Sequence, residues 1–138
     1  MDVLAFKVNY YSDDFEKSFD KLVSKKKFRK LPAQIAELVA EVEKGEFSGT
    51  VLTRSDDPPY DVYKTRLPNK DTNEGKSNGY RVVYLARHDN RTVAFLLVYY
   101  KKEQETVAES YVKAMIDGYF LDIIQEQAEE EEMENTTE

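Results

Sequence analysis

Three consecutive strand-like runs between residues 61 and 102 each carry cations that a protein normally keeps out of its interior. Lys64 and Arg66 are two residues apart in the first run, so an extended chain places both side chains on one face. Arg81 joins them there if the second run pairs with the first. Such a cluster of fixed cations suits the binding of a phosphodiester. Ordinary surface cations, which sheet edges carry against aggregation, are the simpler alternative.

Other chemistries find less support in the residues. Gly75-Lys76-Ser77 fails as a phosphate loop, because Lys70 stands where the motif needs its first glycine and a strand follows instead of a helix. His88 is the only histidine and there is no cysteine, which excludes paired-histidine RNA hydrolysis, thiolate chemistry and histidine- or cysteine-based metal sites. The predicted hairpin turn explains His88 as a solvated residue. We therefore predict no metal and no cofactor.

Charge is distributed unevenly along the 138 residues, whose net charge is −7. Seven acids and no base follow Gln125, which leaves 20 acids against 20 bases in residues 1–125. A neutral body steers weakly toward nucleic acid, so RNA would be met most readily on a pre-assembled particle. We expect a cytoplasmic protein without membrane association, because no apolar run reaches about 18 residues and no basic region precedes an apolar stretch near Met1.

Two helices are predicted after a short strand at residues 4–8. Ser12 is a candidate N-cap for the first helix, which carries an apolar stripe and ends at the basic run 25–30. That run is either a solvated helix end or a patch that touches RNA. Pro32 fits the first turn of the second helix, and Gly45 is its expected stop. Residues 46–60 are interpreted as a loop.

Three strands and a last helix follow. The strands are predicted at residues 61–67, 79–87 and 92–100, and the last two form an antiparallel hairpin. The final strand is apolar on both faces, as an interior strand would be. A helix is predicted over about 106–126, and the acidic residues 127–138 are interpreted as a disordered tail beyond a single domain of residues 1–126. The fold class is α/β (α+β), a small antiparallel sheet in the order β-α-α-β-β-β-α, with the two N-terminal helices on one face and a C-terminal helix.

The same residues resemble a family of bacterial toxins. Tyr63-Lys64-Thr65-Arg66-Leu67, Gly79-Tyr80-Arg81-Val82-Val83-Tyr84 and Lys101-Lys102 occur in the order and spacing of the RelE/ParE superfamily. Gly75-Lys76-Ser77-Asn78-Gly79 is similar to the HigB-type branch, and the resemblance covers residues 3 to about 126. It implies an endoribonuclease that cleaves messenger RNA, in the best-known cases on the ribosome, by attack of the substrate's own 2′-hydroxyl.

The resemblance also implies roles for individual residues. Lys64 corresponds to a residue implicated in acid–base work, and Lys102 to one implicated in the leaving-group step. Arg66 and Arg81 would neutralise charge on the phosphorane. The expected RNA contacts are Lys70, Lys76, Lys101, Tyr100 and Tyr111. One departure stands out: Ala108 occupies the position of a tyrosine that stacks on the substrate base, a role that Tyr100 or Tyr111 would have to take.

Three functions are therefore weighed. The first is the toxin of a bacterial or phage type II toxin–antitoxin system, an mRNA interferase that an antitoxin inhibits by covering the cations or displacing the last helix. The second is a non-catalytic relative that serves as an antitoxin-binding or regulatory module. The third is a ParE-like toxin that poisons DNA gyrase, which the set of Lys64, Arg66 and Arg81 disfavours.

Overall fold

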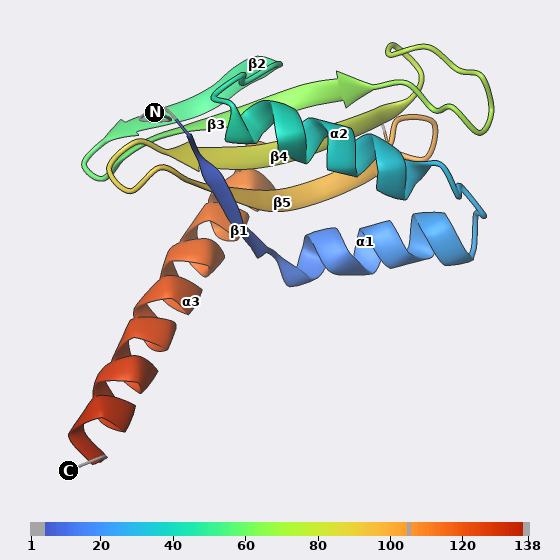
Figure 1. The fold of residues 1–138 in the computed structure, drawn as a ribbon. Helices are drawn as coiled ribbons and strands as arrows, with labels where there is room; N and C mark the ends of the chain where they lie inside the picture. Colours follow the sequence, from blue (N-terminus) through green and yellow to red (C-terminus); the bar gives the residue numbers. More distant parts are fainter. Residues whose placement is uncertain (1–4, 105, 137–138) are drawn as a thin grey trace. The chain divides into compact units, whose positions relative to one another are not determined.

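The computed structural model describes residues 5–104 and 106–136, and the chain divides into two compact units. The first unit ends at Thr106 and contains five strands and two helices, whereas the second begins at Val107 and contains one helix (Figure 1). Leu4 of the predicted first strand, and the last two residues of the predicted tail, lie outside the described residues. No described helix is both long and apolar enough to cross a membrane.

The first unit is built on one mixed sheet in the order β1-β5-β4-β3-β2. Neighbouring strands from β2 to β5 pair antiparallel, whereas β1 pairs parallel with β5. The purely antiparallel sheet that we predicted is therefore wrong at one edge. The physical reason is that no hairpin joins β1 to β5, so their relative direction is not fixed by a turn. The strands are β1 (Lys7–Tyr11), β2 (Thr50–Asp56), β3 (Pro59–Leu67), β4 (Tyr80–Arg87) and β5 (Thr92–Tyr100).

The predicted helices and strands occur in the predicted order, with one additional strand, β2, between the second helix and the first strand predicted after it. Helix α1 (Asp13–Ser24) begins at Ser12, whose Oγ accepts a hydrogen bond of 3.0 Å from the Phe15 amide. Helix α2 (Leu31–Glu43) has its proline in the first turn and is followed by Gly45 at φ 82°, a conformation that favours glycine.

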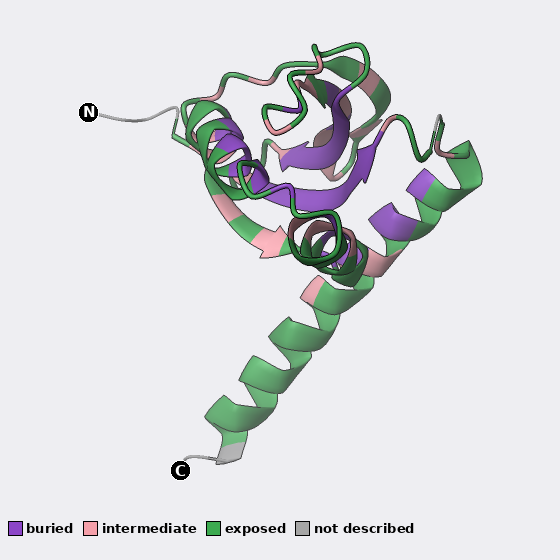
Figure 2. Ribbon diagram, turned by 90° about the vertical axis from the view of Figure 1, so that its right-hand side faces the viewer, coloured by how far each residue is buried: buried purple, intermediate pink, exposed green. Residues whose placement is uncertain are grey.

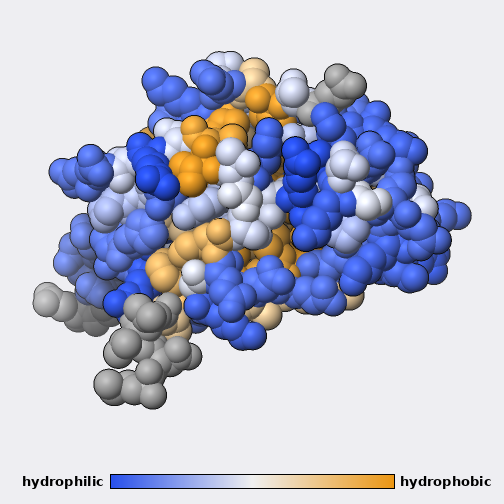
Figure 3. All heavy atoms as spheres, turned by 90° about the horizontal axis from the view of Figure 1, so that it is seen from above, coloured by the Kyte–Doolittle hydropathy of each residue, from blue (hydrophilic) through white to orange (hydrophobic). Residues whose placement is uncertain are grey.

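One strand was missed, because residues 46–60 are not a loop throughout. Thr50–Asp56 forms β2, which pairs antiparallel with β3 around the turn at Asp57-Pro58. Its β-branched residues Thr50, Val51 and Thr53 favour an extended chain. As an edge strand, however, β2 is largely exposed, including Leu52, and lacks the apolar alternation that marks a half-buried strand. Figure 3 shows the side of the molecule on which β2 lies in Figure 1. Hydrophobic residues (orange) are visible at the surface there, flanked by hydrophilic residues (blue).

The core lies between the sheet and helices α1 and α2. It gathers Tyr80, Val82 and Tyr84 of β4 with apolar side chains of β5 and the inner sides of both helices. Every residue of β5 from Val93 to Tyr100 is buried, which confirms its prediction as an interior strand (Figure 2). Because side chains alternate along a strand, the residues between these core positions lie on the opposite face of the sheet.

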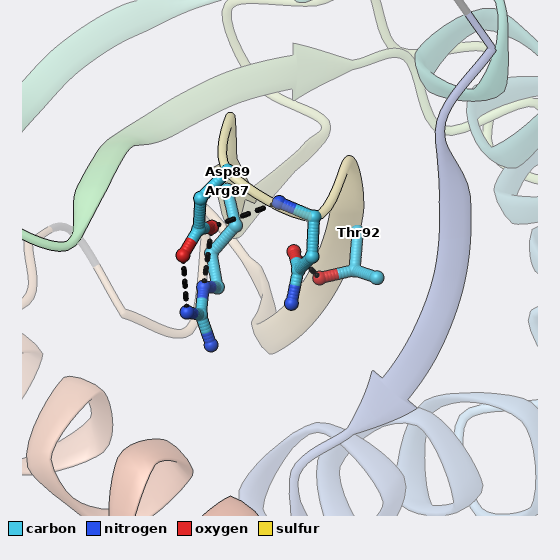
Figure 4. Close-up of polar contacts among 4 residues, drawn as sticks. Arg87, Asp89 and Thr92 are labelled. Atoms are coloured by element: carbon cyan, nitrogen blue, oxygen red, sulfur yellow. Dashed lines mark hydrogen bonds and ion pairs between the residues drawn. The ribbon is translucent and has the colours of Figure 1, made fainter.

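The hairpin of β4 and β5 closes through a polar turn (Figure 4). Arg87 donates two hydrogen bonds to the Asp89 carboxylate, from Nε at 2.9 Å and from Nη2 at 2.6 Å. The Thr92 hydroxyl donates to Asn90 Oδ1 at 2.7 Å. His88 is an exposed residue of this turn, as predicted, and its Nε2 lies 2.8 Å from an Asp61 carboxylate oxygen.

Helix α3 (Glu109–Thr136) makes up most of the second unit. It ends about ten residues later than predicted, so residues 127–136 form helix and not a disordered tail. The physical reason is that glutamate, glutamine, alanine and methionine are strong helix formers, and extending an existing helix needs no new nucleus. The side chains from Ile124 to Asn135 are all exposed, so burial contributes little to the stability of the extension.

Candidate functional site

The pairing of β3 with β4 brings three of the predicted cations to one face of the sheet. Arg66 lies directly opposite Arg81, and Lys64 is opposite Val83. Side chains at directly opposite positions of an antiparallel pair project to the same side, and so do positions two apart in one strand. Lys64, Arg66 and Arg81 are therefore neighbours on the face that points away from α1 and α2. We call these three residues the cation triad.

Arg81 is the buried member of the triad, with 5% of its surface exposed. Its Nη1 donates to the carbonyl oxygens of Lys76 at 2.8 Å and Tyr80 at 3.2 Å, and its Nη2 donates to that of Ser77 at 3.1 Å. Burial lowers the pKa of Arg81, and the charge of Arg66 lowers it further. The guanidinium therefore connects β4 to the loop that precedes it, and it also adds positive charge to this face.

Lys64 and Arg66 are the available members of the triad. Lys64 is half-buried and Arg66 is exposed. Within residues 5–104 and 106–136, neither side chain makes a hydrogen bond or an ion pair. Two cations without a described partner beside a third make this part of the sheet a candidate site for an anion.

The loop of residues 68–79 is held in a fixed shape next to the triad. Asn69 and Glu74 exchange two backbone hydrogen bonds of 2.9 and 3.0 Å, and the Asn69 side chain accepts from the amides of Asp71 and Thr72. Gln34 of α2 donates from its side-chain amide to the Pro68 carbonyl. The loop is therefore anchored both internally and to α2.

Glu74 is the polar centre of this loop, and 14% of its side chain is exposed. Its carboxylate accepts hydrogen bonds from the hydroxyls of Thr72, at 2.6 Å, and Tyr100, and it forms an ion pair of 2.6 Å with Lys102 Nζ. The hydrogen bonds from Lys102, Thr72 and Tyr100 lower the pKa of Glu74 to about 2. The same contact with Glu74 raises the pKa of Lys102, so the ammonium keeps its proton.

Sequence reasoning singled out Lys102 but missed Glu74, its partner. Glu74 is one of two acids, with Asp71, in a Gly- and Asn-rich segment that also carries lysines. The sequence does not show which cation each acid contacts until the loop is closed. The structure brings Lys102 to Glu74, and among the described residues no hydrogen bond or ion pair joins Lys102 to the cation triad.

The remaining predicted residues are dispersed. Lys70 lies 3.7 Å from a carboxylate oxygen of Glu37 on α2, and Lys76 is exposed in the loop. The Lys101 amide donates to the Gly79 carbonyl at 2.9 Å. Tyr100 is 9% exposed and packs edge-on against Phe28, on the face of the sheet opposite to the triad.

Tyr111 and Ala108 belong to the second unit. Tyr111 is an exposed residue of the first turns of α3, and Ala108 immediately precedes the helix, where its carbonyl accepts hydrogen bonds from the Tyr111 and Val112 amides.

Two other predicted features complete the description. The basic run is exposed except for Phe28, and Lys26 forms an ion pair of 2.9 Å with Glu103 just after β5. Across the described part of the chain, no group of three or more histidine or carboxylate side chains is arranged to hold a metal ion.

No protein-family model matches the chain, and no curated protein matches it.

Proposed function

We propose that this protein is a toxin of the RelE/HigB kind, an endoribonuclease that cleaves messenger RNA and is inhibited by a protein antitoxin. The single observation that supports the proposal best is the cation triad. Arg66 lies opposite Arg81, Lys64 is two residues away on the same face, and two of the three charges have no partner among the described residues. Such a site is suited to a phosphodiester and to the extra negative charge that develops when the phosphodiester is attacked.

The proposed reaction uses the substrate as its own nucleophile. The ribose 2′-oxygen forms a bond to the adjacent phosphorus and the bond to the 5′-oxygen breaks, which gives a 2′,3′-cyclic phosphate and a 5′-hydroxyl. Lys64, in its neutral amine form, takes the proton of the 2′-hydroxyl and becomes an ammonium, and the guanidinium groups of Arg66 and Arg81 neutralise the phosphorane. Lys102 is the proposed proton donor to the 5′-oxygen, and this role requires its ammonium to leave Glu74 and reach toward the triad when the substrate binds.

The hydrogen bonds of Arg81 favour a second candidate function. The Arg81 guanidinium is occupied by the carbonyls of Lys76, Ser77 and Tyr80, so a phosphate would have to share or displace these bonds. If Arg81 acts only as a brace for the loop, the same fold serves as a non-catalytic module that binds an antitoxin. The two functions differ in whether the protein cleaves RNA, and the catalytic one requires Arg66 for that cleavage.

The decisive experiment compares three forms of the protein that are expressed without an antitoxin. The wild-type chain should arrest growth, and primer extension should reveal cuts within translated messages. Arg66→Ala should reduce cleavage roughly a hundredfold or more, as expected for the loss of a charge-stabilising donor. Arg54→Ala, at an exposed arginine on edge strand β2, is the matched control and should cleave like the wild type.

Arg66 is a cleaner probe than Arg81. Arg66→Ala removes an exposed side chain that has no hydrogen-bond or ion-pair partner among the described residues, so it should change the free energy of unfolding by less than about 0.5 kcal/mol. Arg81→Ala also removes the hydrogen bonds that hold the loop and is expected to cost about 1–3 kcal/mol. Normal growth with intact messages at high protein levels would favour the non-catalytic module. Fragmented DNA with intact messages would indicate gyrase.

A further inference from the structure

An open groove lies along α1, on the helix-bearing side of the sheet and therefore away from the cation triad. It has a volume of about 360 Å³ and is lined by three aromatic rings, one aliphatic side chain and two carboxylates: Tyr11, Phe15, Phe19, Ile35, Glu16 and Asp20. All six residues belong to the first unit.

The apolar lining is a row of aromatic rings. The ring centroids of Tyr11 and Phe15 are 5.3 Å apart, and those of Phe15 and Phe19 are 5.9 Å apart with ring planes only 12° from parallel. Phe15 and Ile35 are almost fully buried and form the base, whereas 39% of Tyr11 is exposed. The groove therefore presents aromatic surface to solvent next to a rigid base.

The polar lining consists of acids only. Glu16 and Asp20 are four residues apart on α1, so they lie one turn apart on the same flank of the helix. Neither carboxylate makes an ion pair or a side-chain hydrogen bond in the portion of the chain that the structure describes. Lys17 and Lys21, the bases of this helix, are not among the residues that line the groove.

We propose that this groove docks a segment of a partner protein by receiving an arginine side chain. A guanidinium is planar and weakly hydrated, so it stacks on aromatic rings and also donates hydrogen bonds to carboxylates. Tyr11 and Phe19 supply the rings, and Glu16 and Asp20 supply the acceptors. An apolar residue beside the arginine would pack on the base formed by Phe15 and Ile35. The complementary partner is a basic, amphipathic segment.

The test measures binding of a short fluorescent peptide to the full-length protein. The peptide carries leucine and arginine four residues apart, and a second peptide has citrulline, the uncharged isostere, in place of arginine. The arginine peptide should bind, and Glu16→Gln with Asp20→Asn should weaken it about tenfold, which corresponds to about 1.4 kcal/mol. Amide NMR signals of residues 11–20 should shift on binding.

The acidic end of α3 is the main competing site for any basic peptide, so it provides the matched control. Glu130→Gln with Glu134→Gln removes the same charge far along the sequence from the groove and should leave binding and the NMR shifts unchanged. Equal weakening by both double variants would overturn the proposal, and so would equal binding of the citrulline or a lysine peptide. Self-association of the chain that the peptide cannot displace would assign the groove to a second copy and would also overturn it.

Discussion

At the scale of single residues, the cations near the candidate site fall into two groups, those that contact other protein groups and those that do not. Arg81 and Lys102 are engaged, by loop carbonyls in one case and by Glu74 in the other. Lys64 and Arg66 have no partner in the described chain, so they are the charges that an incoming anion meets without first displacing a protein group. The contacts of each cation, and not its residue type alone, therefore decide whether it is available to a ligand.

Glu74 gives a prediction about pH. Its pKa is about 2 in the folded protein against an ordinary value of 4.5, so the folded state prefers the charged carboxylate. A lowered pKa contributes stability that is complete above about pH 4.5 and is lost as the pH falls toward about 2. Urea unfolding of the wild type and Glu74→Gln should therefore give free energies that converge over this pH range.

The control for this prediction is Glu46→Gln, at an exposed carboxylate outside the loop. Its unfolding free energy should follow the wild-type curve across the same pH range. Parallel curves for the wild type and Glu74→Gln would mean that the contacts of Glu74 with Lys102, Thr72 and Tyr100 do not stabilise the folded state.

At the scale of elements, exposed segments were the hardest to predict. Strand β2 is an edge strand whose side chains are mostly exposed, and the end of α3 is a helix whose side chains are entirely exposed. Neither segment has the apolar periodicity by which buried helices and strands reveal themselves. Both form for other reasons: β2 by pairing with β3, and the end of α3 by continuing an existing helix with residues of high helix propensity.

The end of α3 gives the second prediction. Because the side chains from Ile124 to Asn135 are all exposed, truncation after Gln125 should change the free energy of unfolding by less than about 0.5 kcal/mol. Far-UV circular dichroism should nevertheless lose the signal of the deleted turns. A fall in stability of more than about 1 kcal/mol, measured by urea unfolding, would show that these turns have a structural role.

At the scale of the whole molecule, the net charge conceals the charge distribution. Residues 1–125 carry equal numbers of acids and bases, and the net charge of −7 comes from the acids that follow. The cation triad is therefore a local positive site on a chain that is acidic overall, and long-range attraction to RNA is weak. Binding should depend on a few close phosphate contacts.

This distribution gives a prediction about salt. If the three cations of the triad each contact one phosphate, the logarithm of the affinity for single-stranded RNA should fall with the logarithm of salt concentration with a slope of about −2. Fluorescence anisotropy across a range of salt concentrations measures this slope. Arg66→Ala should reduce its magnitude by about 0.7, and Arg54→Ala, on β2, should not change it. A slope near zero would exclude the triad as the RNA contact.

The sequence by itself determined the buried elements and the shared face of Lys64 and Arg66. Apolar periodicity and capping residues such as Ser12 are local, so they indicate where α1, α2, β4 and β5 lie before any tertiary contact is known. The tertiary structure alone decided which cations are engaged. The contacts of Lys102 with Glu74 and of Arg81 with the carbonyls of the preceding loop require both strand register and a closed loop. The repeating apolar pattern of a sequence cannot predict such contacts, because each joins two groups through one specific three-dimensional geometry.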